Sequence, residues 1–253
     1  MSGLTLLVSH TAIAQDEFAS SFAGFGFDIN GIRLDLPAKE SLKAFDPEFY
    51  FKKGEWTDSQ GEFVREDVGT QAFGRGHINS VRESYRVSVT PWHAGNLSYE
   101  VMRDVGINRD DKKPTIADFV AATKAKYGEP ASELKKALHQ RRGVQMLYTV
   151  KDGKIVDVPC FKADVIWFNA MRRTAERVQK THARLEQINS THCDAVLSVH
   201  YTEDFRNPGR VRNFGATARD FRLEAESFIA DVKEREAATE ARQVATPKAT
   251  PDL

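Results

Sequence analysis

Two cysteines and two neighbouring histidines offer the chemistry that is easiest to recognise in this chain. Cys160 and Cys193 are the only cysteines among 253 residues, and their even number predicts one disulfide in an exported protein. Two buried, reduced thiols in a cytosolic protein and a share in a metal site are the alternatives. No C-x-x-C or H-x-x-x-H spacing occurs, so no metal is predicted, and His192 and His200 are only weak candidate ligands.

The same two histidines could serve as a general base if a carboxylate lay beside them. They are eight residues apart around a predicted strand over 193–201. An even spacing would put both rings on one face if the strand covered them. Asp194 and Glu203 are the nearest candidate carboxylates in the sequence, and solvated histidines are the alternative.

Two further groups of residues form a predicted partner surface. Trp92 and His93 follow Pro91 at the end of an expected strand, where they could form a recognition spot; the alternative is that Trp92 packs on the core and His93 lies at the surface. A basic run could contact an acidic partner or anionic lipid headgroups, or could simply be solvated. That run contains Lys135, Lys136, Arg141 and Arg142.

The familiar catalytic and cofactor motifs are missing from the sequence. It has no G-x-S-x-G, H-E-x-x-H, P-loop or G-x-G-x-x-G after a strand, so we predict no catalytic residue and no cofactor. The 36 basic residues balance 36 acidic ones, which argues against nucleic acid as a partner. No run of eighteen apolar residues is present, so no membrane-spanning helix is expected.

The two ends of the chain differ in composition from the middle. Residues 1–14 contain no Asp, Glu, Lys or Arg and end in Ala-Ile-Ala, which predicts a signal peptide cleaved before Gln15. A basic segment is missing from it, and a buried first strand is the alternative. Residues 237–253 are rich in Ala, Thr and Pro and are expected to form a disordered tail.

Between these ends, the pattern predicts an α+β fold with an antiparallel sheet, a few packed helices and a long C-terminal helix. Apolar and polar residues alternate over 84–90, as in a strand with one wet face. Thr115 and Gly128 punctuate a helix, and Asp152-Gly153 predicts a hairpin turn. The globular region is placed at 15–236, with a division into lobes at 15–130 and 131–236 as an option.

Other segments carry weaker patterns, and each leads to a definite expectation. We expect strands over 25–34, with a turn or bulge at Asn30-Gly31, and over 48–51, 99–105, 144–150 and 154–158. Helices are expected over 38–45, over 161–188, where 165–168 could equally form a strand, and from about 221 onward, and a surface loop is expected over 52–66.

Two short segments of the sequence resemble segments of known proteins. Residues 31–40, GIRLDLPAKE, resemble the opening G-I-x-L-G-M-[STP]-x-x-E of uncharacterised exported bacterial proteins, with Asp35-Leu36 in place of Gly-Met. Residues 126–130, KYGEP, resemble the K-Y-G-x-P phrase that follows in such chains. The opening is also similar to small lipoproteins of outer-membrane barrel assembly and to β-lactamase-inhibitor modules. The resemblance covers about residues 25–160 and implies an exported α+β domain with a binding or envelope role, without catalytic residues.

Together, these observations predict a bacterial protein of the periplasm or the secreted fraction. We expect a cell-envelope binding or structural protein without catalytic activity, whose partner is another envelope protein. The alternatives are an envelope hydrolase with dispersed His and Asp residues, and a secreted inhibitor or effector of a partner protein.

Overall fold

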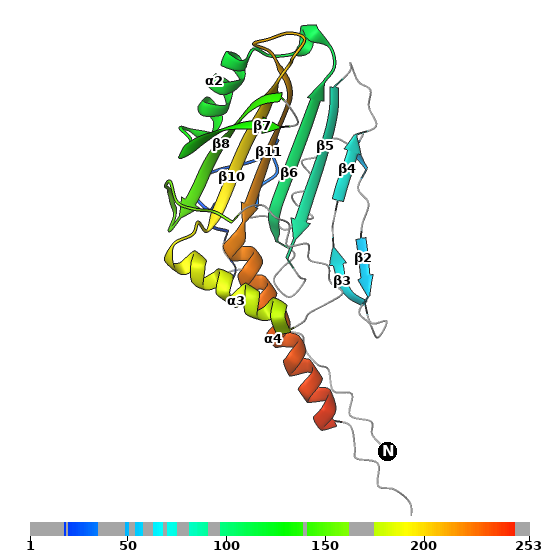
Figure 1. Cartoon of the computed structure of the whole chain (residues 1–253). Coiled ribbons are helices and arrows are strands. Elements are labelled where there is room, and N and C mark those ends of the chain that lie inside the picture. Colours follow the sequence, from blue (N-terminus) through cyan, green and yellow to red (C-terminus); the bar gives the residue numbers. More distant parts are fainter. Residues whose placement is uncertain are drawn as a thin grey trace, which may run out of the picture.

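The fold is an antiparallel sheet with helices packed on it, as Figure 1 shows for the computed structural model of the chain. The structure describes residues 18, 20–34, 49–50, 54–57, 63–67, 70–74, 81–90, 97–138, 141–161 and 175–245. The α+β class predicted from the sequence is confirmed. Trp92 and His93 and the expected helix over 38–45 lie outside the described residues.

Nine strands form the main sheet, and every described pair in it is antiparallel. Across the sheet they run in the order β1 (Phe49–Tyr50), β4 (Thr70–Gly74), β5 (Val81–Val89), β6 (Ser98–Ile107), β11 (Val211–Asp220), β10 (Ala195–Glu203), β8 (Arg141–Lys151) and β7 (Ser132–Leu138), with β9 (Lys154–Ile155) on β8. A separate hairpin pairs β2 (Gly54–Thr57) with β3 (Phe63–Asp67).

Three α-helices complete the described part of the chain. Helix α2 (Ile116–Tyr127) packs on the sheet, while α3 (Ala175–Ser190) and α4 (Phe221–Ala245) contact each other at one end of it (Figure 1). A 3-10 turn, η5 (Asp110–Lys112), and the β10–β11 connection lie at the opposite end. No described helix is both long and apolar enough to cross a membrane.

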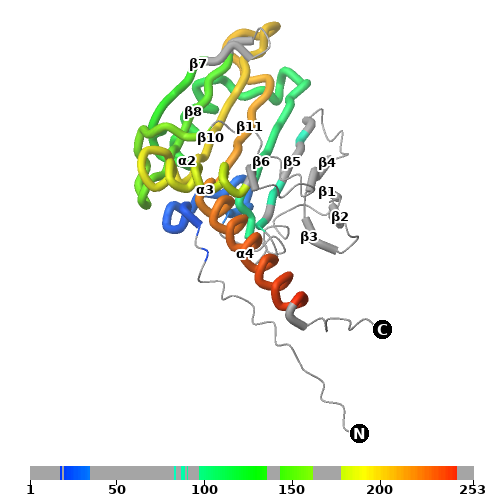
Figure 2. Tube along the Cα trace, turned by 60° about the horizontal axis from the view of Figure 1, so that its bottom comes forward, coloured from blue at the N-terminus to red at the C-terminus, as the bar shows by residue number. Residues whose placement is uncertain are grey.

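The main core lies on the side of the sheet that α2 covers. Alternate residues of the central strands are buried there, because successive side chains of a strand point to opposite faces. Residues 20–34 pack on the same side, and in Figure 2 their blue trace runs beside the sheet. The buried cluster includes Phe22, Ile29, Ile32, Val101, Met146, Tyr148, Leu197, Val199 and Ala216.

The turn chemistry of the sequence is found in the backbone. Asp152 and Gly153 both have positive φ, 49° and 68°, as the predicted hairpin between β8 and β9 requires. Asn30 and Gly31 also have positive φ, 55° and 85°. They form the turn expected at Asn30-Gly31, closed by a single bridge of Ile29 with Ile32, but the residues around it do not form the strand expected over 25–34.

Several boundaries differ from those read in the sequence. The polar stretch 52–66, expected as a loop, contains β2 and the start of β3. Described helix in the segment 161–188 begins at Ala175, and Phe161 lies outside any helix. Helix α4 continues to Ala245, so the tail boundary predicted at 236 falls inside it; Ala, Glu, Gln and Arg all favour helix.

The single sheet also bears on the optional division into two lobes. Strands β5 and β6 precede residue 130, β7, β8, β10 and β11 follow it, and β6 pairs directly with β11. The sheet therefore continues across the proposed division.

Candidate functional site

A cavity of about 450 Å³ lies between α2 and the sheet. We call it the α2 cavity. Its floor comes from β10 and β11, where Val199 and Ala216 face each other in register beside Phe214. Phe119 and Tyr127 of α2 and Ile29 of the N-terminal turn form its walls. Its remaining lining comes from Asn30, Arg103, Pro114, Asp118, Ala122, Thr123, Lys126 and Gly215.

The ends of α2 fix the wall that faces the cavity. Thr115 caps the helix, its hydroxyl accepting a hydrogen bond from the Asp118 N–H at 3.0 Å. Gly128 ends the helix with φ of 83°, and its N–H donates to the Lys124 carbonyl. This confirms the helix boundaries read from the sequence. Residues three and four apart then share one face of the helix and line the cavity together.

Aromatic rings on that face of α2 contact aromatic rings of the sheet and so position the helix over it. The Phe119 ring lies 5.5 Å from Tyr201 and 5.2 Å from Phe214, measured between ring centroids. At the other end of the helix, Tyr127 lies 5.9 Å from Tyr148. Burial raises the pKa of Tyr127, so its phenol stays neutral and donates to the Asp28 carbonyl at 2.8 Å.

Charged groups stand at the edge of this apolar space. Lys126 Nζ lies 3.0 Å from Asp28 Oδ1. Burial alone would raise the pKa of Asp28, but the Gly31 N–H and the Lys126 ammonium outweigh it and lower that pKa. Arg103 pairs with Glu83. The exposed Asp118 also lines the cavity, so both signs of charge border an apolar floor.

A buried carboxylate holds the N-terminal wall in place. Asp220, at the junction of β11 and α4, accepts hydrogen bonds from the Ser21 N–H at 2.6 Å and from the Ser20 and Ser21 hydroxyls. It also accepts the Leu223 N–H at 2.9 Å, as an N-cap of α4 does. Burial raises the pKa of Asp220 to about 6. One side chain therefore fixes both the start of α4 and the segment that leads to Ile29.

A second group of polar residues lies on the opposite face of the sheet. His200, Gly215 and Asp104 occupy one row across β10, β11 and β6. The His200 Nε2 atom lies 3.7 Å from Asp104 Oδ1, across the intervening strand. A Cβ on Gly215 would come within 2.7 Å of both side chains, so the missing side chain at Gly215 makes room for the pair.

Hydrogen-bonding side chains surround this pair. Gln145 lies opposite His200 in register and donates to Ser198 Oγ at 2.6 Å. Its own Oε1 is buried and accepts no hydrogen bond within the described part of the chain. Asn213 donates to the Thr202 hydroxyl at 3.1 Å. The row is thus polar, in contrast to the α2 side.

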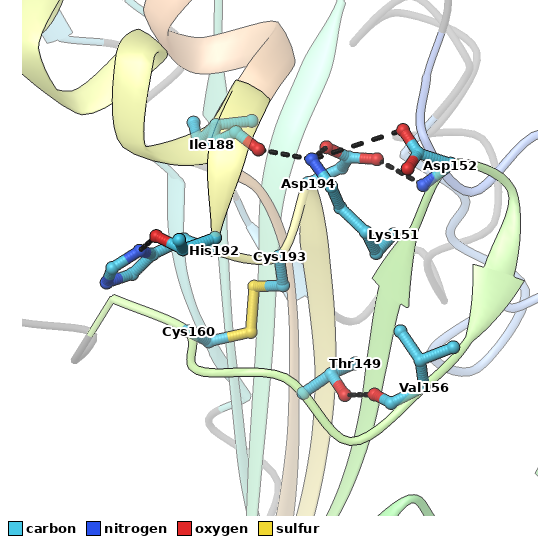
Figure 3. The surroundings of a disulfide bond; sticks show 10 residues. Thr149, Lys151, Asp152, Val156, Cys160, Ile188, His192, Cys193 and Asp194 are labelled. Carbon is cyan, nitrogen blue, oxygen red and sulfur yellow. Dashed lines mark hydrogen bonds and ion pairs between the residues drawn. A yellow bond between two sulfur atoms is a disulfide. The ribbon is translucent and has the colours of Figure 1, made fainter.

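The disulfide predicted from the sequence is present. Cys160 and Cys193 are bonded, with their Cα atoms 5.1 Å apart (Figure 3). The bond joins the segment that follows β9 to the short connection between α3 and β10. Beside it, Asp194 Oδ1 lies 2.8 Å from Arg222 and 3.4 Å from Lys151, while Oδ2 accepts the Asp152 N–H.

The two candidate histidines are not brought together. Strand β10 begins at Ala195, so His192 lies before it and does not share a face with His200 as expected. The His192 ring stacks on Phe161 at 4.6 Å and points away from the Asp194 cluster (Figure 3). Asp194 and Glu203, the expected carboxylates, bind other groups. The described residues contain no group of three metal-ligating side chains.

The predicted partner surface is described in part. Lys135, Lys136, Arg141 and Arg142 all lie in the β7–β8 hairpin at the edge of the sheet, where Lys136 pairs with Gly143 and Ala137 with Arg142. Lys135 is exposed. The basic residues of this run therefore lie on two paired strands at the edge of the sheet.

Comparisons of the chain with protein-family models, with curated proteins and with solved structures give no match.

Sequence reasoning missed the residues that line the α2 cavity. A signal was present only for the helix, whose cap and apolar spacing predict a face directed to the sheet. Arg103 and Phe214 come from strands more than a hundred residues apart in the chain. Their meeting depends on the pairing of β6 with β11, which no local pattern shows.

Proposed function

We propose that this protein is an exported cell-envelope binding protein that takes a compact, mainly apolar ligand in the α2 cavity. The observation that carries the proposal is the cavity itself. Its volume of about 450 Å³ falls within the range of small-molecule sites, about 300–1,000 Å³. Such sites combine an apolar lining with a few polar groups, as this one does.

The chemistry of the lining defines the ligand further. Val199, Ala216, Phe214 and Phe119 offer apolar contacts, so the body of the ligand is hydrophobic. Lys126 and Asp118 stand at the edge, where a polar group of the ligand can keep contact with charge. A fused ring with one polar end meets both conditions.

The export half of the proposal is supported by two independent features. A disulfide persists in an oxidising compartment and is rare in the cytosol. Residues 1–14 contain an apolar stretch that ends in Ala-Ile-Ala, the small-x-small pattern of a signal-peptide cleavage site. The intact mass of the protein expressed with its native N-terminus tests both: export predicts a chain that begins at Gln15 and gains two hydrogens on reduction. A full-length chain with two free thiols would contradict it.

Binding in the cavity is tested by filling it. The neutral fluorescent probe N-phenyl-naphthylamine is expected to bind the native protein saturably, with an increase in fluorescence. Both Ala122 and its neighbour Ala121 are exposed, but only Ala122 lines the cavity. Ala122→Trp should therefore abolish probe binding, and the matched variant Ala121→Trp should retain it. Equal binding by both variants would place the probe elsewhere and reject the proposal.

The partner expected from the sequence, another envelope protein, remains part of this proposal. If this protein transfers the bound ligand to that partner, its binding to the partner should differ between the open cavity and the cavity filled by a tryptophan side chain. Crosslinking in the envelope with the native chain and with Ala122→Trp compares the two states. Identical crosslinks from both proteins would show that partner binding does not depend on the cavity.

One observation favours a second candidate function, an envelope hydrolase. Ser198, His200 and Asp104 supply a hydroxyl, an imidazole and a carboxylate on one face of the sheet, and Gly215 makes room for the last two. In that reaction His200 would take the proton of an attacking hydroxyl or water. Hydrolysis of a p-nitrophenyl ester that is lost in His200→Gln would support it. Hydrolysis that His200→Gln leaves unchanged would dismiss it.

A further inference from the structure

One end of the sheet combines an exposed aromatic ring with an excess of arginine and lysine. We call it the basic tip and define it as residues 109–113 and 203–212. The Phe205 side chain is 62% exposed, the largest value among the exposed large hydrophobic residues that the structure describes. It lies in the β10–β11 connection, at the end of the molecule opposite α4 (Figure 1).

Two guanidinium groups flank this ring. Arg206 and Arg212 lie 5.3 and 5.4 Å from the Phe205 ring centroid. Both distances are within the range of cation–π contact. An arginine that stacks on a ring can still direct its N–H groups at a phosphate oxygen, because its donors lie in the plane of the guanidinium.

The acidic residues of the basic tip are engaged within the protein. Asp110 and Asp204 both bind Lys113, Asp111 binds Arg109, and Glu203 accepts the Gly209 N–H. The tip contains six basic and four acidic residues, which leaves a surplus of two positive charges. Its electrostatic field therefore favours an anionic surface.

The β7–β8 hairpin adds to this charge. Thr202 of β10 pairs with Gly143 of β8, so the start of β8 lies at the same end of the sheet as the basic tip. Lys135 and Lys136 near the end of β7, and Arg141 and Arg142 at the start of β8, therefore belong to this end of the sheet by strand position.

We propose that the basic tip docks on a lipid bilayer that contains anionic phospholipid, with Phe205 inserted among the headgroups. Aromatic side chains favour the membrane–water interface, and basic residues beside them bind anionic headgroups. This role is separate from the α2 cavity, since none of the residues of the basic tip lines it.

The shape of the tip favours a membrane over a protein partner. A specific protein interface buries more than about 1,000 Å² and needs a complementary surface. Phe205 is one ring on a short turn, bordered by charged and polar residues, and offers no extended apolar area. A fluid bilayer accepts a single ring without a preformed pocket.

Sedimentation of the full, oxidised chain with vesicles tests this proposal. We expect binding to vesicles of phosphatidylcholine mixed with phosphatidylglycerol, none to phosphatidylcholine alone, and weaker binding at high salt because the charges are then screened. Phe205→Ser should weaken binding about tenfold, because the ring no longer leaves water on docking. Replacing Arg206 or Arg212 by Gln should weaken it about fivefold for each arginine.

Leu134 provides the matched control. It is also exposed, at 43%, but lies on β7 and outside the basic tip. Leu134→Ser should bind vesicles like the native chain, and melting curves would show that both serine variants fold. Absence of binding to phosphatidylglycerol vesicles would overturn the proposal, and binding to polyglutamate in that case would assign the tip to an acidic protein. Equal vesicle binding by Phe205→Ser would overturn the insertion of the ring.

Discussion

Replacement of Gly215 by alanine tests whether the central strand is built to accommodate the His200–Asp104 pair. The added Cβ would lie 2.6 Å from the Arg103 carbonyl oxygen, 2.6 Å from His200 Cε1 and 2.7 Å from Asp104 Oδ1. The two side chains can rotate away, but the backbone carbonyl cannot move without shifting β6. We therefore expect a cost of about 3 kcal/mol, the upper part of the usual range for overpacking.

A chain of this size loses about 2–4 °C of melting temperature for each kcal/mol, so Gly215→Ala should melt about 6–12 °C lower. Thermal unfolding followed by circular dichroism measures this. Gly153→Ala is the comparator, because its Cβ meets no atom within 4 Å and only its φ of +68° is unfavourable. Its expected cost is about 1 kcal/mol. A Gly215→Ala melting temperature equal to or above that of Gly153→Ala would refute the reasoning.

Three further predictions follow from other parts of the structure. Cys160→Ser opens a loop of 33 residues and should cost about 4 kcal/mol on the chain-entropy argument, measured by urea unfolding under oxidising conditions; an unchanged midpoint would contradict it. Burial raises the pKa of Asp220 from 3.8 to about 6, so the native chain holds a proton between these values that the unfolded chain has lost. Its contribution to stability therefore falls by about 3 kcal/mol as pH rises from about 4 to 6, and Asp220→Asn should lack that fall; parallel pH profiles of the two proteins would exclude it. Arg219→Met leaves the buried Glu224 carboxylate without its bidentate partner and should destabilise by about 3–5 kcal/mol. The double variant with Glu224→Leu should restore part of this loss, because Arg219 also binds the buried Glu100 at 3.4 Å; no restoration at all would refute the assignment of the loss to Glu224.

The α2 cavity and the basic tip are close to each other in the fold. The Ile116 N–H, at the start of α2, donates to the Gly209 carbonyl in the β10–β11 connection, and Thr115 forms a bridge with Arg210. Pro114 lines the cavity and its carbonyl accepts from Val211. A ligand with an apolar body and a surface of anionic lipid would therefore meet the protein at neighbouring places.

Local patterns predicted the elements whose causes are local. Thr115 and Gly128 bound α2 because a cap depends on a hydroxyl or a positive φ at a single position. Asp152-Gly153 predicted its turn for the same reason. The prediction failed over 52–66, where polar composition indicated a loop and two short strands are found. A hairpin needs only backbone pairing, which polar side chains permit.

The sequence by itself determined the class of fold, the disulfide and the ends of the best-marked helix and turn. Periodicity and capping residues are signals that extend over only a few neighbouring residues, and the number of cysteines is a simple count. None of these signals requires knowledge of which strands lie side by side. The α2 cavity and the meeting of His200 with Asp104 were decided only by tertiary structure. These two residues are 96 positions apart in the chain. They lie in one row because β10, β11 and β6 are neighbours in a particular register. Strand order and register are set by the packing of the whole sheet, and a one-residue shift would turn either side chain to the other face.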